Sequence, residues 1–324
     1  DKPLLVDEYL GHAIELDVDA ACDGTEVLIG AVMEHLEEAG IHSGDSTCFI
    51  PTQNISEEMI ERVKIQTRNI GLGLGIKGCY NIQFAIQGDN LYCLEVNPRS
   101  SRTVPFVAKA TGVPMAKIAA KVTLGINLSQ QEIPEATSGH VAVKAPVFPF
   151  IKLQGLDPAP GPEMKSTGEV YGSDLRADVA YLKARLATEI PVAKSGGAYL
   201  TVRDEDKENL VSIAEKLQNL GFTLYATPGT SDTLRANNLE VQTVYRIAER
   251  QHPDALDLMR KGEVSFIVNV PTISGGAVRD GNMMRRLAVE MNIPFVTTMS
   301  GAAMEVAAIK AGMELEIQPK ERVI

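Results

Sequence analysis

Alternating apolar and polar residues predict a β-hairpin over residues 79–97. One face of each arm would be apolar, with Ile82, Phe84 and Ile86 in the first arm and Tyr92, Leu94 and Val96 in the second. A three-residue loop at 88–90 would pair Gln87 with Leu91. That register places Gln83 directly opposite Glu95, and Asn81 directly opposite Asn97, on the polar face of the hairpin.

This polar face carries oxygen ligands that suit a hard metal ion. Directly opposed side chains have Cβ atoms roughly 5 Å apart, so a single ion can contact both. Gln83, Glu95 and Asn97 offer one carboxylate and two amide oxygens, a set that fits Mg²⁺ (or Mn²⁺) completed by phosphate oxygens and water. Arg99 and Arg102 follow within reach of an anion bound to the ion. The pattern predicts a phosphoryl-transfer site, and the alternative is a merely solvated face of a half-buried hairpin.

From residue 197 onward, short apolar runs alternate with amphipathic helices. A helix after Asp204 would bury one apolar stripe and end at Gly221. This alternation predicts a parallel, doubly wound sheet, in which ligands bind at the carboxyl ends of the strands. The loops 227–231 and 269–276 lie at such ends. The first suits a phosphate at a helix N-terminus, or an ordinary capped helix with Thr230 or Ser231 as N-cap. The predicted strands are 198–202, 222–226, 241–245, 266–270, 295–298 and 314–317.

Proline and glycine divide the rest of the chain into further elements. Helices are predicted at 57–69, at 103–121 with an interruption at 112–114, and after an N-cap at Asp174. In the last helix Leu175, Val179, Leu182 and Leu186 share one face by spacing. The glycines of 71–75 precede a strand instead of following one, so they do not form a dinucleotide-binding loop. A boundary near 187–197 predicts two domains, 1–190 and 191–324.

Composition narrows the class of protein. The net charge of −11 argues against nucleic acid or an anionic membrane as a partner. The four cysteines lack C-x-x-C spacing, which favours reduced thiols over zinc ligands or a disulfide framework. There is no apolar run of membrane-spanning length and no signal peptide in this sequence. We therefore expect a cytoplasmic enzyme.

The segment 95–106, E-V-N-P-R-S-S-R-T-V-P-F, resembles the metal-binding segment of ATP-grasp enzymes and, within them, of the large subunit of carbamoyl-phosphate synthetase. Residues 103–106 are similar to the half that phosphorylates carbamate. Residues 40–46 match the G-x-H-S-G-D-S loop of that family. The resemblance implies a partial ATP-grasp domain and a ligase that makes carbamoyl phosphate from carbamate and ATP, for pyrimidine and arginine synthesis.

The resemblance also implies roles for individual residues. Glu8 and Leu10 would meet the adenine, Leu10 through its backbone, and Glu15 would bind the ribose hydroxyls. Arg99 and Arg102 would bind carbamate and stabilise the transferred phosphoryl group, with His42 donating to a phosphate. Without the family, Glu15, Asp17 and Asp19 on one strand face are expected to be solvated. The implied nucleotide-binding residues are Glu8, Leu10, Glu15, Gly40, Ile41, His42, Ser43, Gln83 and Glu95.

Residues 197–324 resemble the methylglyoxal-synthase-like domain that ends the same large subunit and binds regulatory nucleotides. Val270-Pro271 depart from the family pattern, which leaves Thr272 unassigned and the effector open between UMP-like and IMP-like nucleotides. The segment 250–254 lacks the G-G-D-Q-Q sequence of methylglyoxal synthase, so lyase activity is not expected. By position, the effector would contact Lys207, Thr227, Thr230, Arg246 and Asn269.

The chain starts in what looks like the middle of a domain, without the lid and first subdomain of an ATP-grasp enzyme. It therefore resembles the C-terminal part of a longer polypeptide. The implied partners are the remainder of the large subunit, a glutaminase small subunit and a regulatory nucleotide, with a possible homo-oligomer. The parent enzyme would be a glutamine-hydrolysing synthetase. The alternative is a catalytically incompetent chain that acts only as a nucleotide-binding regulatory module.

Overall fold

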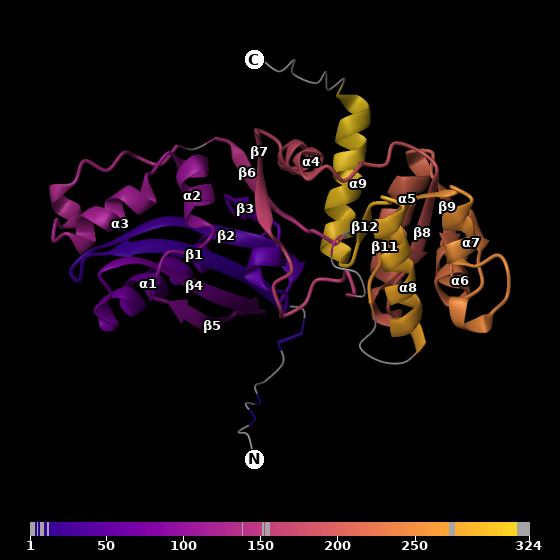
Figure 1. Ribbon diagram of the computed structural model, residues 1–324, viewed down its shortest axis with the longest axis horizontal. Coiled ribbons are helices and arrows are strands. Elements are labelled where there is room, and N and C mark those ends of the chain that lie inside the picture. The colour runs from indigo at the N-terminus through magenta and orange to yellow at the C-terminus, as the bar shows by residue number, and fades with distance from the viewer. Residues whose placement is uncertain are drawn as a thin grey trace. The chain divides into compact units, whose positions relative to one another are not determined.

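The computed structural model describes residues 4, 6, 10, 11, 13–137, 139–150, 152, 156–271 and 276–315 (Figure 1). It contains a seven-stranded sheet, in the order β5-β4-β1-β2-β3-β6-β7, and a five-stranded sheet, in the order β10-β9-β8-β11-β12. The chain forms two compact units, Asp1–Lys144 and Ala145–Ile324. The predicted domain boundary at 190/191 stays a prediction.

The strands of the first sheet pair antiparallel from β5 through to β6. The predicted break between two helices at 112–114 is confirmed, and Gly112 ends the first of them with a φ of +75°. The strands are β1 (Ile14–Cys22), β2 (Val27–Glu38), β3 (Cys48–Ile50), β4 (Gly78–Gln87), β5 (Asn90–Asn97), β6 (Val141–Val147) and β7 (Gly168–Asp174). The helices are α1 (Glu57–Gly73), α2 (Val104–Thr111) and α3 (Met115–Thr123), with 3₁₀ turns at Ser43–Asp45 and Leu128–Gln130.

Helix α1 covers the apolar face of β1 and β4. Leu16, Val18 and Ile82 on that face are fully buried. The Tyr80 hydroxyl donates to the Thr67 carbonyl of α1 at 2.9 Å. A Cβ at Gly71 would lie 2.4 Å from that hydroxyl oxygen. The first glycine of 71–75 therefore belongs to a helix–sheet contact, which agrees with the prediction that this run is not a dinucleotide-binding loop.

The predicted pairing of Gln83 with Glu95 and of Asn81 with Asn97 is confirmed, but the hairpin loop is shorter than predicted. Gln87 pairs with Asn90, so the turn has two residues, 88 and 89. A β-bulge at Leu94 then adds one residue to β5, and Gln83 still pairs with Glu95. The bulge also reverses the alternation in the first part of β5, because Tyr92 now pairs with Ala85 on the polar face. The prediction that Tyr92 shares a face with Val96 is therefore wrong.

The second sheet is entirely parallel, as predicted for a doubly wound fold. One face packs on α5 and α9 through residues such as Leu200, Leu210 and Val306, and the other face packs on α7 and α8. The strands are β8 (Gly197–Thr201), β9 (Thr223–Ala226), β10 (Val241–Thr243), β11 (Val264–Asn269) and β12 (Phe295–Val296). The helices are α4 (Ala177–Ala187), α5 (Lys207–Asn219), α6 (Pro228–Ala236), α7 (Ala255–Arg260), α8 (Gly276–Glu290) and α9 (Met299–Glu314), with 3₁₀ turns at Asp204–Asp206 and Ile247–Glu249.

Helix α4 lies against α9, and this contact explains why the second unit begins before the predicted boundary (Figure 1). The side chain of Glu305 in α9 is fully buried and accepts hydrogen bonds from the Tyr181 hydroxyl at 2.8 Å and from Arg185 Nε at 2.9 Å. A buried carboxylate needs such donors, because an unpaired one would carry a large desolvation cost. Residues 177–187 therefore help to fold the unit that contains the parallel sheet.

Three local predictions are wrong. Asp174 ends β7 and accepts from the Arg176 amide, and Arg176 is the N-cap of α4. The buried face of α4 also differs from the predicted one. Leu175, which was predicted to lie on it, is exposed, and Tyr181, which was not, is buried. The first residue of the strand predicted at 314–317 is helical instead, because α9 continues to Glu314. Residues 316 and 317 lie outside the described residues. Among the described helices, none combines the length and apolarity needed to cross a bilayer.

Candidate active site and effector pocket

The polar face of the first sheet brings the predicted metal-binding residues into adjacent rows. Asp17 on β1 pairs with Gln83 on β4, which pairs with Glu95 on β5. The next row contains Asp19, Asn81 and Asn97. Strand pairing alone therefore places Gln83 beside Glu95, with Asn97 two residues further along the same strand.

The hydrogen bonds of these residues leave the amide oxygen of Gln83 available as a ligand, while the amide oxygen of Asn97 is shared with Arg99. Gln83 Nε2 donates to Ser43 Oγ at 2.7 Å, so the amide oxygen of Gln83 is the arm left for a cation. Asn97 Oδ1 accepts from Arg99 Nη2 at 3.2 Å, which joins a predicted metal ligand to a predicted anion-binding residue. Glu95 is exposed. One carboxylate and two amide oxygens fit Mg²⁺, whose remaining positions are usually taken by phosphates and water.

The loop 40–46 lies beside this face, as the predicted nucleotide site requires. The Gly40 amide donates to Glu15 Oε1 at 3.3 Å, and a φ of +97° at Gly40 is a conformation that favours glycine. His42 is exposed and its Nδ1 accepts from the Gly44 amide at 3.0 Å. The proton of neutral His42 is therefore on Nε2, which can donate to a phosphate.

The predicted adenine-binding segment is described only in part. Leu10 is partly buried, and the next residue, Gly11, accepts at its carbonyl from Gln87 Nε2 at 3.0 Å. This bond holds the backbone beside Leu10 near the end of β4. Glu8 lies outside the described residues.

The three carboxylates of β1 are buried, so the expectation that they are solvated is wrong. Glu15, Asp17 and Asp19 are 7%, 2% and 0% exposed. His35 of β2 lies between the first two, with Nδ1 3.4 Å from Glu15 Oε2 and Nε2 3.2 Å from Asp17 Oδ2. Burial by itself lowers the pKa of His35, but Cys48, Asp17 and Glu15 outweigh burial and hold that pKa well above its ordinary value. A charged histidine thus compensates the buried acids.

Asp19 holds the segment that carries the two predicted arginines. Its carboxylate accepts from Ser101 Oγ at 2.7 Å, from Thr103 Oγ1 at 2.6 Å and from Asn81 Nδ2 at 3.0 Å. Burial raises the pKa of Asp19 to about 6, although these hydrogen bonds oppose the shift. Ser101 and Thr103 flank Arg102, so Asp19 anchors the backbone from which Arg99 and Arg102 project into solvent.

Sequence reasoning missed His35 and Lys144, two buried cations among the described residues of the first unit. Lys144 is 1% exposed and its Nζ donates to the Ser43 carbonyl at 3.1 Å, behind the loop 40–46. Lys144 interrupts the apolar run of β6, and His35 lies among the acidic residues Glu34 and Glu37 of β2. That was the available signal, and it required knowledge of which strands are neighbours.

The second unit contains a cavity of about 370 Å³ at the carboxyl ends of β8, β9 and β11. In a doubly wound sheet this edge is the usual ligand site, next to the point where the strand order reverses. All five predicted effector-binding residues line the cavity: Lys207, Thr227, Thr230, Arg246 and Asn269. Sequence reasoning missed other lining residues, including Tyr199, Arg203 and Asp280.

Residues at the start of α6 line this pocket. Thr227 is the N-cap and Pro228 the first helical residue, so the prediction of Thr230 or Ser231 as N-cap is wrong by three or four residues. Ser231 is buried and shares a hydrogen bond with Thr243. A Cβ at Gly229 would lie 2.8 Å from Lys207 Nζ, so glycine leaves room for the ammonium at the helix N-terminus.

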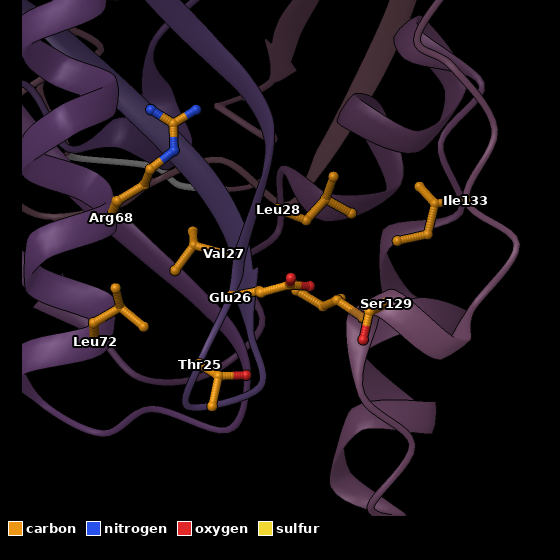
Figure 2. Close-up of a pocket in the computed structure, with 9 residues that line it drawn as sticks. Thr25, Glu26, Val27, Leu28, Arg68, Leu72, Ser129 and Ile133 are labelled. Carbon is orange, nitrogen blue, oxygen red and sulfur yellow. The ribbon is translucent and has the colours of Figure 1, made fainter.

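Two other features carry no catalytic arrangement. A cavity of about 420 Å³ beside the turn between β1 and β2 is lined mostly by apolar side chains such as Val27 and Leu72, with Arg68 on one wall (Figure 2). His252, Asp254 and Asp257 lie within reach of one ion, but Asp254 and Asp257 exchange hydrogen bonds with each other's backbone amides as the cap of α7.

Comparisons with known proteins agree with both halves of the prediction. The family model for the carbamoyl-phosphate synthase L chain, ATP binding domain, matches residues 1–131, and the model for the MGS-like domain matches residues 209–297. The predicted combination of an ATP-grasp part and a methylglyoxal-synthase-like part is therefore confirmed. A solved N5-carboxyaminoimidazole ribonucleotide synthetase from Thermus thermophilus is 16% identical, with a TM-score of 0.42 over 56% of this chain and 51% of that chain, too low to carry an argument.

Two curated relatives bear the same name. The carbamoyl phosphate synthase large chain of Methanosphaerula palustris is 48% identical over 309 residues, which are 95% of this chain and 29% of the relative. This chain thus spans less than a third of that relative's length. The carbamoyl phosphate synthase large chain of Methanosarcina barkeri is 47% identical over 322 residues, which are 98% of this chain and 80% of the relative. The chain belongs to the family of carbamoyl phosphate synthase large chains.

Proposed function

We propose that this chain contributes the site at which ATP phosphorylates carbamate to carbamoyl phosphate. The observation that carries the proposal is the pairing of Gln83 with Glu95 beside Asn97, whose amide oxygen accepts a hydrogen bond from Arg99. A carboxylate and two amide oxygens beside an arginine are the parts that phosphoryl transfer needs, because its catalysis is mainly positioning and charge stabilisation.

Each predicted residue then has a part in the reaction. Gln83, Glu95 and Asn97 would hold Mg²⁺ (or Mn²⁺), which would neutralise charge on the ATP phosphates when bound. His42 Nε2 would donate to a phosphate oxygen, and Ser43 would orient the Gln83 amide. Arg99 and Arg102 would bind carbamate and the transferred phosphoryl group through their planar guanidinium groups.

Glu15 would bind the ribose hydroxyls through lone pairs of its two carboxylate oxygens that the Gly40 amide and His35 do not use. Leu10 would meet the adenine through its backbone. The loop 40–46 would cover the nucleotide from one side, because the Lys144 contact fixes the Ser43 carbonyl from behind. ATP is thus held by one loop, one strand face and one backbone segment.

The pocket of the second unit supports regulation by a nucleotide. A phosphate of a UMP-like or IMP-like ligand would bind to Lys207, Arg246 and the start of α6. The same ligand would form further hydrogen bonds with Thr227, Thr230 and Asn269. The remainder of the large subunit and a glutaminase small subunit in the cytoplasm would complete a glutamine-hydrolysing synthetase. A second candidate, favoured by the complete set of effector residues, is a chain that by itself binds the regulatory nucleotide without turning over ATP.

The replacement Glu95→Gln in the complete synthetase tests the metal site. We expect carbamoyl phosphate synthesis to fall to background with the fold intact, because the ion loses its only carboxylate among the three ligands. Asp89→Asn at the exposed tip of the same hairpin is the matched control and should keep full activity. Near-normal synthesis by Glu95→Gln would contradict the proposal.

A further inference from the structure

Behind the effector pocket lies the buried guanidinium of Arg285, in α8. The side chain is 1% exposed, and each of its three nitrogens has a partner. Nε and Nη2 donate to the two carboxylate oxygens of Asp157 at 2.8 and 2.5 Å, and Nη1 donates to Oδ1 of Asn269. Asn269 lines the pocket at the end of β11. Arg285 therefore connects a pocket residue to a carboxylate far away in the sequence.

The backbone of α8 leaves space for this contact. Gly281 lies one helical turn before Arg285, and a Cβ there would lie 2.8 Å from Arg285 Nη1 and 3.2 Å from Asn269 Oδ1. Any larger residue would push the guanidinium away from Asn269. A glycine that costs helix stability is thus placed where the contact needs room.

Asp157 balances the charge that this contact buries. Burial raises the pKa of Asp157, but hydrogen bonds from Arg285, the Ala159 amide and Asn282 outweigh it and lower the pKa below its ordinary value. The ionised carboxylate accepts hydrogen bonds from two nitrogens of Arg285 and so fixes the plane of the guanidinium. Only Nη1 remains for Asn269, and its direction is set by that plane.

A guanidinium has donors only, so it determines which way round the Asn269 amide lies. The carbonyl oxygen must face Arg285, and the Nδ2 donor is the arm that remains for the pocket. We propose that Arg285 is a positioning residue that makes Asn269 a fixed hydrogen-bond donor to the effector. The group recognised there is then an acceptor oxygen, such as a phosphate or hydroxyl oxygen of a nucleotide. This inference rests on the proposed regulatory function.

Titration calorimetry of the full chain with UMP and with IMP tests the inference. Arg285→Lys keeps the charge but loses the planar fork, so we expect binding of the preferred nucleotide to weaken at least roughly tenfold. Arg286→Lys is the matched control, since Arg286 is the next residue of α8 and is exposed; its affinity should match the unmodified chain. Equal affinity of Arg285→Lys and the unmodified chain would overturn the inference.

Two changes at Asn269 separate positioning from general stability. If Arg285 acts through Asn269, Arg285→Lys should have no further effect on affinity in an Asn269→Ala background. Asn269→Asp keeps an acceptor for Arg285 but removes the donor, so the protein should fold and lose nucleotide binding. An equal loss from Arg285→Lys in both backgrounds, or full binding by Asn269→Asp, would overturn the positioning role.

The orientation of Asn269 is also measurable without a ligand. With asparagine labelled by ¹⁵N, we expect one sharp pair of Nδ2 proton signals for Asn269, broadened by exchange in Arg285→Lys and unchanged in Arg286→Lys. Unchanged signals in Arg285→Lys would overturn the inference. If neither nucleotide binds the unmodified chain, the proposed regulatory function fails, and these signals still decide whether Arg285 orients Asn269.

Discussion

The two candidate sites lie on different parts of a β-sheet, one on a face and the other at the ends of the strands. In the first unit, the site lies on the face of an antiparallel sheet, and strand pairing brings Gln83, Glu95 and Asn97 together. In the second unit, the site lies at the carboxyl ends of parallel strands, and loops and the start of α6 surround a cavity. The first arrangement fixes spacing through backbone hydrogen bonds. The second gains enclosure, but its side chains need support from behind, as Asn269 has from Arg285.

Apart from Glu95→Gln, the largest effect should come from the exposed arginines of the first site. We expect Arg99→Lys and Arg102→Lys each to lower kcat of the complete synthetase by roughly 10³-fold, because a lysine cannot make the bidentate contact to carbamate or phosphate. Steady-state kinetics checks this, with Arg62→Lys on α1 as an exposed control. If both variants stay within a few-fold, the sheet face provides general electrostatics and the contrast with the enclosed pocket weakens.

A second test asks where the enclosed site gets its support. The free energy of unfolding should be roughly 3–5 kcal/mol larger for the fragment 145–324 than for the fragment 197–324. The shorter fragment loses Asp157, the partner of Arg285, and also Tyr181 and Arg185, the partners of Glu305. Urea unfolding of the two fragments measures the difference. Equal stabilities would mean that the parallel sheet and its helices form the whole unit.

The pH dependence of stability sharpens the description of the first site. The pKa of Asp19 is about 6 in the folded chain, against an ordinary value of 3.8, so the protonated form favours folding. That contribution is fully present below about pH 3.8 and is lost as the pH rises through about 6. Relative to the unmodified chain, Asp19→Asn should therefore gain roughly 1–3 kcal/mol in free energy of unfolding between about pH 4 and pH 7.5.

Urea titrations of both proteins across that range measure the relative gain. Asp89→Asn, at an exposed carboxylate, should leave the pH dependence unchanged. A constant difference between Asp19→Asn and the unmodified chain would show that Asp19 does not titrate in this range. Its hold on the segment 101–103 would then not depend on pH.

The smallest expected effect is at the start of α6, which lines the pocket. Thr230 is 2% exposed and lines the cavity, so Thr230→Val should remove one hydrogen bond and weaken nucleotide binding by roughly 1–2 kcal/mol. Thr233→Val, one turn later in α6, is the control and should bind normally. Calorimetry that finds no change for Thr230→Val would place the phosphate away from the start of α6.

The sequence predicted what short-range periodicity encodes. The alternation along 79–97 and the strand–helix repeat after residue 197 placed both sites, because each pattern depends on neighbouring residues. It did not predict the burial of Glu15 and Asp17, which depends on His35 arriving from another strand. It did not predict Asp157 as the partner of Arg285, since a contact across 128 residues leaves no periodic signal.

The boundaries show a similar limit. A helix can begin wherever its first turn finds a cap, and α6 begins at Pro228, directly after its N-cap Thr227, because proline suits the first helical position. The strand predicted at 314–317 begins inside α9 because packing against α4 extends the helix to Glu314. At Glu314 local propensity gave the wrong element, and tertiary contact decided it.

The bulge at Leu94 has a consequence for the conformations that the tip of the hairpin can adopt. A two-residue turn and one extra residue in β5 give the same pairing of Gln83 with Glu95 as a three-residue loop without a bulge. One residue can therefore move between the tip and the bulge of the hairpin without any insertion or deletion in the chain. Because this exchange keeps the number of residues between Gln83 and Glu95 constant, the metal-binding rows stay paired whichever of the two conformations the tip adopts.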